Sequence, residues 1–193
     1  MSSVANVAMV VVYFIYFRGM VYGPTRPNPA TWIIWVGANA VNAFSYRAVV
    51  GDISAAVLPY IVLLLSIGIS VYAFTRGKFS RLEPLEVGAL VVALAVGVLW
   101  RVTGDARFAN LSIQVVYAIS YVPLVVRFVR GTAREDPAPW IIAVIAFVFM
   151  VVSIFVSGNR DPAAFVYPIV NGILGNGTIV VLAIRERSKT EPD

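Results

Sequence analysis

The chain contains neither cysteine nor histidine. Without thiols it has no disulfide and no cysteine nucleophile, and without imidazoles it lacks the side chain that most often serves as general base or zinc ligand. Charged residues are also scarce, at 13% of 193 residues, against about 25% in an average soluble protein. We therefore expect no enzyme, with no catalytic residues, no bound metal and no cofactor.

Apolar residues take the place of the missing charges. They make up 60% of the chain, and the mean hydropathy is +0.84. Uncharged stretches approach the length of about 20 residues that a helix needs to cross a bilayer. The composition predicts an all-α integral membrane protein whose main partner is lipid.

Charged loops and proline- or glycine-rich segments divide the chain into seven expected spans. They lie at residues 4–22, 31–48, 53–74, 84–100, 109–129, 138–157 and 162–184. No change of composition marks a separate soluble domain, and only the final residues have the polar character of a solvated tail.

The basic residues predict the orientation, because cytoplasmic loops of membrane proteins carry an excess of lysine and arginine. With the N-terminus outside, the cytoplasmic segments hold eleven of the fifteen basic residues, and only Arg47, Arg101, Arg107 and Arg160 lie on the opposite side. We therefore expect a multi-pass protein with its N-terminus outside and its C-terminus in the cytoplasm. The net charge of +5 then reflects topology, and we expect no nucleic-acid partner.

A short motif occurs twice. The pattern Pro-Ala-x-Trp-Ile-Ile begins at Pro29 and again at Pro137, 108 positions later. Tyr13 and Tyr121 match in the preceding spans, and Pro59 matches Pro168 after a shift of one residue. The pattern predicts two three-helix repeats.

Three spans end on the side opposite their start, so one extra helix must separate two repeats of the same orientation. We expect seven transmembrane helices, arranged as two parallel three-helix repeats joined by a linker helix. The first repeat covers residues 1–78, the linker helix and its loops 79–108, and the second repeat with a short C-terminal tail 109–193. Repeats of this kind place a substrate site between them, near the middle of the membrane.

Two segments of the second repeat carry a family likeness. They read SYVPLVVRFVRGTAREDPAPW, from Ser120, and YPIVNGILGNGTIVVLAIRER, from Tyr167. Together with the three-plus-one-plus-three layout, they resemble the SWEET, SemiSWEET and PQ-loop group of small transporters. Pro123 matches the proline of the family's Pro-Gln pair, although Leu124 follows it. Asn171 matches the family's substrate-facing asparagine, whose place in the first repeat is taken by Val62. The resemblance implies a transporter of small solutes.

Neutral polar and aromatic residues form stripes within the expected spans. Helical spacing places them on common faces, and buried amides must meet protein or water. We expect the following residues to bind a substrate: Trp35, Asn39, Asn42, Tyr46, Gln114, Tyr117, Tyr121, Tyr167, Asn171 and Thr178. The alternative is that the asparagines only hold neighbouring helices together.

Prolines within the spans are candidate hinges, since each frees a backbone carbonyl. They are Pro59, Pro123 and Pro168, and a static kink is the alternative role. Trp32 and Trp140 stand near the starts of two spans, where we expect them to be interfacial anchors.

These features favour a facilitative transporter of a small, mostly uncharged solute, which works by alternating access between two three-helix bundles. No carboxylate falls in the middle of a span, so the usual groups for proton coupling are missing there. The alternative is a non-transporting receptor or assembly subunit built on the same duplicated scaffold. The sequence leaves open whether the chain forms a homo-oligomer.

Overall fold

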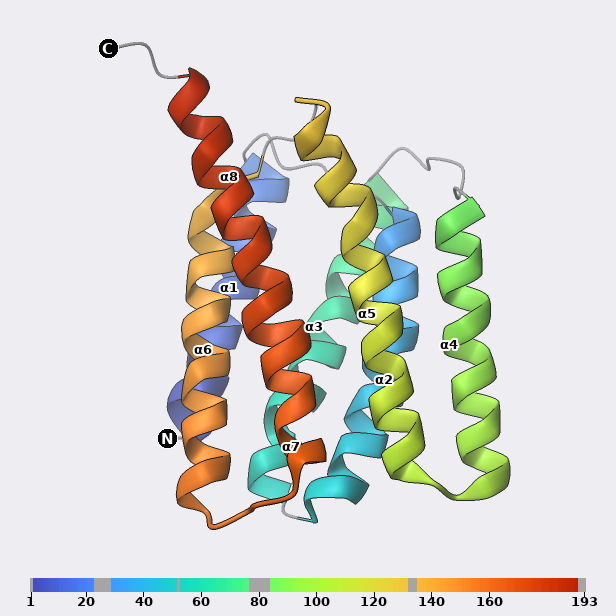
Figure 1. Ribbon diagram of the computed structural model, residues 1–193. Helices are drawn as coiled ribbons and strands as arrows, with labels where there is room; N and C mark the ends of the chain where they lie inside the picture. The colour runs from blue at the N-terminus through green and yellow to red at the C-terminus, as the bar shows by residue number, and fades with distance from the viewer. Residues whose placement is uncertain (1, 23–28, 52, 77–83, 132–134, 191–193) are drawn as a thin grey trace.

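A computed structural model describes residues 2–22, 29–51, 53–76, 84–131 and 135–190. Within these ranges the chain is helical and contains no strand. The elements are α1 (Ser2–Tyr22), α2 (Pro29–Val50), α3 (Ile53–Arg76), α4 (Pro84–Thr103), α5 (Ala106–Val129), α6 (Pro137–Val156), α7 (Pro162–Val166), the π-helix η1 (Tyr167–Gly175) and α8 (Asn176–Thr190). Figure 1 shows them as a bundle of roughly aligned helices, with the chain termini toward opposite ends.

Helix starts and stops follow local chemistry. Asp136 and Asp161 accept hydrogen bonds from the backbone amides of Ala138 and Ala163, both at 3.0 Å, and a proline occupies the first turn after each aspartate. An aspartate cap and an early proline are typical of a helix N-terminus. Gly104, directly after α4, has a φ of 71°, which only glycine adopts without strain and which allows the tight turn into α5.

A helix covers each of the seven ranges expected from the sequence, and the all-helical class is confirmed. Five helical segments among the described residues are long and apolar enough to cross a membrane: Ser3–Tyr22, Ala56–Arg76, Ala106–Val129, Pro137–Val156 and Pro162–Ser188. Val87–Thr103 is apolar but shorter. The remaining helix, α2, contains two asparagines, a serine and Arg47, which lower its hydropathy.

The outer surface of the bundle is apolar. Large hydrophobic side chains are exposed along several helices, for example Phe14 at 67%, Leu64 at 67% and Val181 at 66%. Apolar surface on this scale is typical of a protein surrounded by lipid.

The helices pack in a regular order. Among the described residues, the backbone of α3 packs against those of both α1 and α2, whereas the backbones of α1 and α2 lie further apart and their contact is through side chains such as Tyr16 and Trp32. In the same way η1 contacts both α5 and α6, which do not contact each other. The two groups of helices meet where α1 packs on α6 and where α2 packs on α5, and α4 packs against the outside of α2 and α5.

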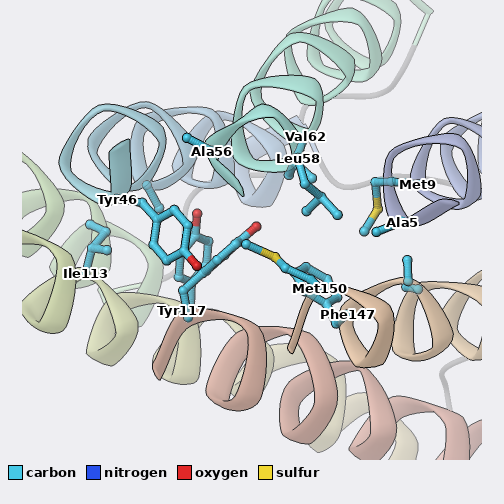
Figure 2. Packing of buried hydrophobic residues seen from close by; sticks show 14 of the residues in the cluster. Ala5, Met9, Tyr46, Ala56, Leu58, Val62, Ile113, Tyr117, Phe147 and Met150 are labelled. Carbon is cyan, nitrogen blue, oxygen red and sulfur yellow. The ribbon is translucent and has the colours of Figure 1, made fainter. Parts of the chain in front are cut away.

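The core lies between these two groups. Figure 2 shows side chains from α1, α2, α3, α5 and α6 converging there, among them Met9, Tyr46, Val62, Tyr117 and Phe147. Tyr46, Tyr117, Phe147 and Tyr167 contribute rings to this core, and its other buried members are aliphatic residues or methionines.

The last crossing segment is interrupted by the π-helix η1, which the sequence did not predict. It begins beside Pro168, which has no amide hydrogen to donate. The carbonyl of Asn171 accepts from the Asn176 side chain at 3.0 Å, and that of Gly172 accepts from the same side chain at 2.8 Å. A π-helix inside an α-helix is frequent at functional sites.

Candidate solute-binding cavity

A cavity of about 80 Å³ lies between the helices and extends inward from the first turns of α2 and α6. Its lining comes from α1, α2, α3, α5, α6, η1 and α8. The residues are Met9, Val12, Tyr13, Tyr16, Trp32, Trp35, Asn39, Val62, Tyr117, Tyr121, Pro139, Trp140, Ala143, Phe147, Asn171 and Asn176. The volume exceeds the space that a single water molecule needs, so the cavity has room for a small solute or several waters.

Half of the lining residues are aromatic, and several of their rings are in contact. Trp32 lies 5.4 Å from Tyr16 and 5.0 Å from Trp35, measured between ring centroids. Trp35 in turn lies 6.1 Å from Tyr121. These distances are those of favourable aromatic pairs, so a continuous series of rings from α1, α2 and α5 forms part of the wall.

Asn39 is the polar centre of one wall. Its side-chain nitrogen donates to Ser66 Oγ at 2.8 Å, and its oxygen accepts from the Tyr117 hydroxyl. Ser66 donates to the carbonyl of Val62 at 2.6 Å, so it accepts the hydrogen of the Tyr13 hydroxyl, 2.9 Å away. The result is a polar chain that links α1, α3, α2 and α5.

Trp35 lies on the same side of the cavity and is also held. Its indole nitrogen donates to Ser120 Oγ at 2.8 Å, and Ser120 donates to the carbonyl of Tyr117 at 2.7 Å. The first bond joins α2 to α5, and the second lies within α5. They fix the Trp35 ring against the wall.

Asn171 and Tyr121 form a second polar group in the lining. The Tyr121 hydroxyl donates to the side-chain oxygen of Asn171 at 3.1 Å. The adjoining Asn176 uses its amide nitrogen for two backbone carbonyls of η1. The Tyr121 bond holds the π-helix against α5, and the Asn176 bonds join α8 to η1.

Asn42 and Gln114 do not line the cavity. They belong to a fully buried amide cluster with Asn110, in which the oxygen of Asn42 accepts from Asn110 at 3.1 Å and from Gln114 at 3.2 Å. Gln114 also donates to the carbonyl of Asn110 at 2.9 Å. The cluster joins α2 to α5 away from the cavity.

Three further predicted residues lie outside the lining. Tyr46 and Tyr167 are fully buried with their ring centroids 5.4 Å apart, and the Tyr46 hydroxyl donates to the carbonyl of Ala164 at 2.8 Å. Thr178 is exposed, and its hydroxyl donates within its own helix to Leu174 at 2.8 Å. Trp35, Asn39, Tyr117, Tyr121 and Asn171 are therefore the predicted residues that the structure brings together at the cavity.

Of the predicted hinges, Pro59 lies inside α3 and Pro168 near the start of η1, and both are fully buried. Pro123 falls within α5, and its side chain lies outside the described part of the structure.

Several lining residues were not predicted to bind a solute. Trp32 and Trp140, expected to be interfacial anchors, both line the cavity, as do Tyr13 and Tyr16. Ser66, the acceptor for both Asn39 and Tyr13, was also missed. A single serine in an apolar span is not enough to predict a binding site from the sequence.

The 108-residue spacing could have found most of the missed residues. Pairs of lining residues separated by 108 positions are Met9 and Tyr117, Tyr13 and Tyr121, Trp32 and Trp140, Trp35 and Ala143, and Asn39 and Phe147. Val62 and Asn171, 109 positions apart, also both line it. Several pairs of positions 108 or 109 residues apart in the chain therefore contribute to the same cavity.

Among the residues that the structure describes, no charged side chain lines the cavity. The half-buried carboxyl of Glu135, just before α6, lies near Tyr16 and Trp140. Burial raises the pKa of this carboxyl above its ordinary value and Asp136 adds to the effect, whereas Arg127 acts in the opposite direction. The nearby charge is thus partly balanced, and the cavity itself is neutral.

Comparison with protein-family models, curated proteins and solved structures gave no match for this chain.

Proposed function

We propose that this protein is a facilitative membrane transporter of a small, mostly uncharged solute, which it passes between two three-helix bundles by alternating access. The observation that carries the proposal is a cavity between the helices, lined by uncharged residues from both halves of the chain. Central cavities between repeats are where transporters of this architecture bind their substrates.

The proposal includes two parallel repeats, α1–α3 and α5–α8, with α4 as the linker. The packing order supports it, because α3 lies between α1 and α2 as η1 lies between α5 and α6. A two-fold axis along the bundle would relate α1 to α5 and α2 to α6. It would therefore relate the contact between α1 and α6 to the contact between α5 and α2, and both contacts are present. The paired lining residues support the same axis. The resemblance to the SWEET and PQ-loop group is part of this proposal.

The two contacts between the bundles differ in chemistry, which suggests how access alternates. Between α2 and α5, hydrogen bonds join Trp35 to Ser120, Asn39 to Tyr117, and Asn42 to Asn110 and Gln114. Among the described residues, none of the buried polar side chains comes from α1 or α6. The buried residues of these two helices include small or flexible apolar ones such as Ala5, Met9 and Met150.

Apolar contacts can slide without leaving a polar group unpaired, whereas each hydrogen bond across α2 and α5 would have to be broken. In the proposed cycle the α2–α5 contact acts as the pivot and the α1–α6 contact opens. Pro59 and Pro168 are the proposed hinges within the moving bundles, and Pro123 keeps the same proposed role in α5.

The alternative is a non-transporting receptor or assembly subunit. One observation favours it: the amides of Asn39, Asn42 and Asn171 all bond to neighbouring protein groups. The cavity itself favours transport, because a scaffold held together by these bonds has no need of an aromatic-lined space.

Uptake into proteoliposomes tests the proposal. Purified protein is reconstituted and offered sugars, nucleosides, vitamins, amino acids and small ring compounds. The variant Ala143→Phe places a ring in the cavity, and Val91→Phe, at a 59% exposed position of α4, is its matched control. Uptake that the first variant abolishes and the second preserves is the expected result. Failure of the wild-type protein to carry any solute on the panel would count against transport.

A further inference from the structure

The proposed function allows any small, mostly uncharged solute, and the chemistry of the cavity wall indicates a narrower class. Apart from the indole nitrogen of Trp140, most hydrogen-bonding groups of the wall are engaged with one another. Asn39 uses both ends of its amide, the Tyr13 and Tyr117 hydroxyls are bonded to Ser66 and Asn39, and the Trp35 indole is bonded to Ser120. The side-chain oxygen of Asn171 accepts from Tyr121.

A polyhydroxylated solute fits such a wall poorly. Each of its hydroxyl groups would leave water and find few free partners, and an unmatched buried polar group opposes binding. A sugar would have to displace bonds that also hold α2 against α5. The wall offers instead the surfaces of Tyr16, Trp32, Trp35, Trp140 and Phe147.

Aromatic rings bind flat rings well, by stacking or by edge-to-face contact. The wall already shows such contacts among its own members, with Trp32 at 5.0 Å from Trp35 and at an interplanar angle of 70°. A small ring between α2 and α6 would extend this series from Trp35 toward Trp140 and Phe147. The described lining residues carry no charge and so offer no partner to an ionised solute.

Resting on the proposed function, we infer that the solute is a small, flat, uncharged aromatic or heteroaromatic compound, not a sugar. The aromatic lining residues bind this solute through contacts with its ring, and few hydrogen bonds are required.

Binding to the purified full chain tests this inference without any transport step. The probes are benzamide, cyclohexanecarboxamide and glucose. The first two carry the same amide on a six-membered ring and differ in flatness and aromaticity. Three of the four tryptophans line the cavity, so tryptophan fluorescence reports occupancy directly, and calorimetry provides an independent affinity.

We expect benzamide to bind about tenfold more tightly than cyclohexanecarboxamide, since each of several ring contacts adds to the preference. Glucose should not bind measurably. Equal affinity for the two amides, or tighter binding of glucose, would overturn the inference.

Variants locate the binding. Trp140→Leu removes one ring of the wall and should weaken benzamide binding about tenfold, whereas Trp140→Phe should restore most of it. Trp100→Leu, on α4 and outside the lining, is the control and should bind as the wild type does. Melting temperatures of all three variants show whether each is folded. Among folded variants, a Trp140→Leu protein with unchanged affinity would contradict the inference.

The two proposals fail separately. Tight binding of benzamide with no uptake of any ring compound would refute transport and leave the ring preference standing. Uptake of glucose without binding of benzamide would refute the ring preference and leave transport standing.

Discussion

Asn39 and Asn42 lie one turn apart on α2, yet they have different surroundings. Asn39 lines the cavity, with its amide held by Ser66 and Tyr117. Asn42 lies in the buried amide cluster with Asn110 and Gln114. Because a helix places residues three apart at different angles, a single stripe in the sequence divides into a cavity residue and a packing residue.

We expect Asn42→Leu to destabilise the fold while leaving solute affinity unchanged. The substitution removes the acceptor shared by Asn110 and Gln114, which costs about 1–3 kcal/mol when buried donors lose their partner. Thermal unfolding in detergent measures the loss. Thr178→Leu is the control, because Thr178 is exposed and bonds only within its helix. An Asn42→Leu protein with a wild-type melting temperature and weakened binding would place Asn42 in the site.

Glu135 gives a prediction for pH dependence. Because burial raises the pKa of its carboxyl in the folded chain, the folded state holds this proton to higher pH than the unfolded state does. Its contribution to stability is fully present below the unfolded pKa of about 4.5 and is lost as pH rises through the raised value. Arg127, Asp136, Tyr16 and Trp140 face the group.

The expected result for Glu135→Gln is a melting temperature that exceeds the wild-type value by a margin that grows as pH rises from about 4.5 and becomes constant above the raised pKa. Melting curves collected at several pH values for both proteins measure the difference. Parallel curves for the two proteins would show that the Glu135 carboxyl is not perturbed.

At the scale of one element, the last crossing segment depends on close approach to its neighbours. A Cβ atom at Gly172 would lie 2.1 Å from Phe147 Cγ, and one at Gly175 would lie 2.5 Å from Tyr121 Cε2. At Gly177 a Cβ would meet nothing within 4 Å. The π-helix η1 therefore packs against α5 and α6 through two positions that tolerate no side chain.

Gly172→Ala should lower stability by about 1–3 kcal/mol, the usual cost of overpacking, because Phe147 must move. Gly177→Ala should be neutral or slightly stabilising, since alanine favours helix over glycine. Thermal unfolding of both variants tests the contact, and Phe147→Leu added to Gly172→Ala should recover part of the loss. If both alanine variants melt alike, η1 does not make this contact.

For the whole molecule, the proposed orientation sets which helix ends face the cytoplasm. The C-terminal ends of α1, α3, α5 and α8 lie at one end of the bundle (Figure 1). This end carries Arg18, Arg76, Arg127, Arg130, Arg185 and Arg187 in or beside those helices. By the positive-inside rule, this excess of arginine supports the proposed orientation, with this end facing the cytoplasm.

Cysteine labelling tests the orientation, because the chain has no cysteine of its own. Ser188→Cys, near the end of α8, should react with an impermeant reagent only after the cells are opened. Ser157→Cys, just after α6, should react on intact cells. Reaction of both residues from the same side would refute the span count, and the reversed pattern would refute the orientation.

The sequence alone determined the solvent and the elements of this protein. A chain with 60% apolar and 13% charged residues has long apolar stretches that are suited to helices in lipid. The helices lie in the seven ranges that charged loops and proline- or glycine-rich segments mark off. Local signals such as Asp136 and Asp161 fixed helix starts, because a cap acts on backbone groups within a few residues.

Only the tertiary structure decided which polar residues share a cavity. Periodicity places Asn39, Asn42 and Tyr46 on one face of α2, but the side chains opposite that face come from α3, α5 and α7. Those partners bring Asn39 to the cavity and leave Asn42 and Tyr46 in packed contacts. The same holds for Trp32 and Trp140, whose place in the cavity wall depends on two helices that lie more than a hundred residues apart in the chain. A pattern within one helix carries no information on what packs against it.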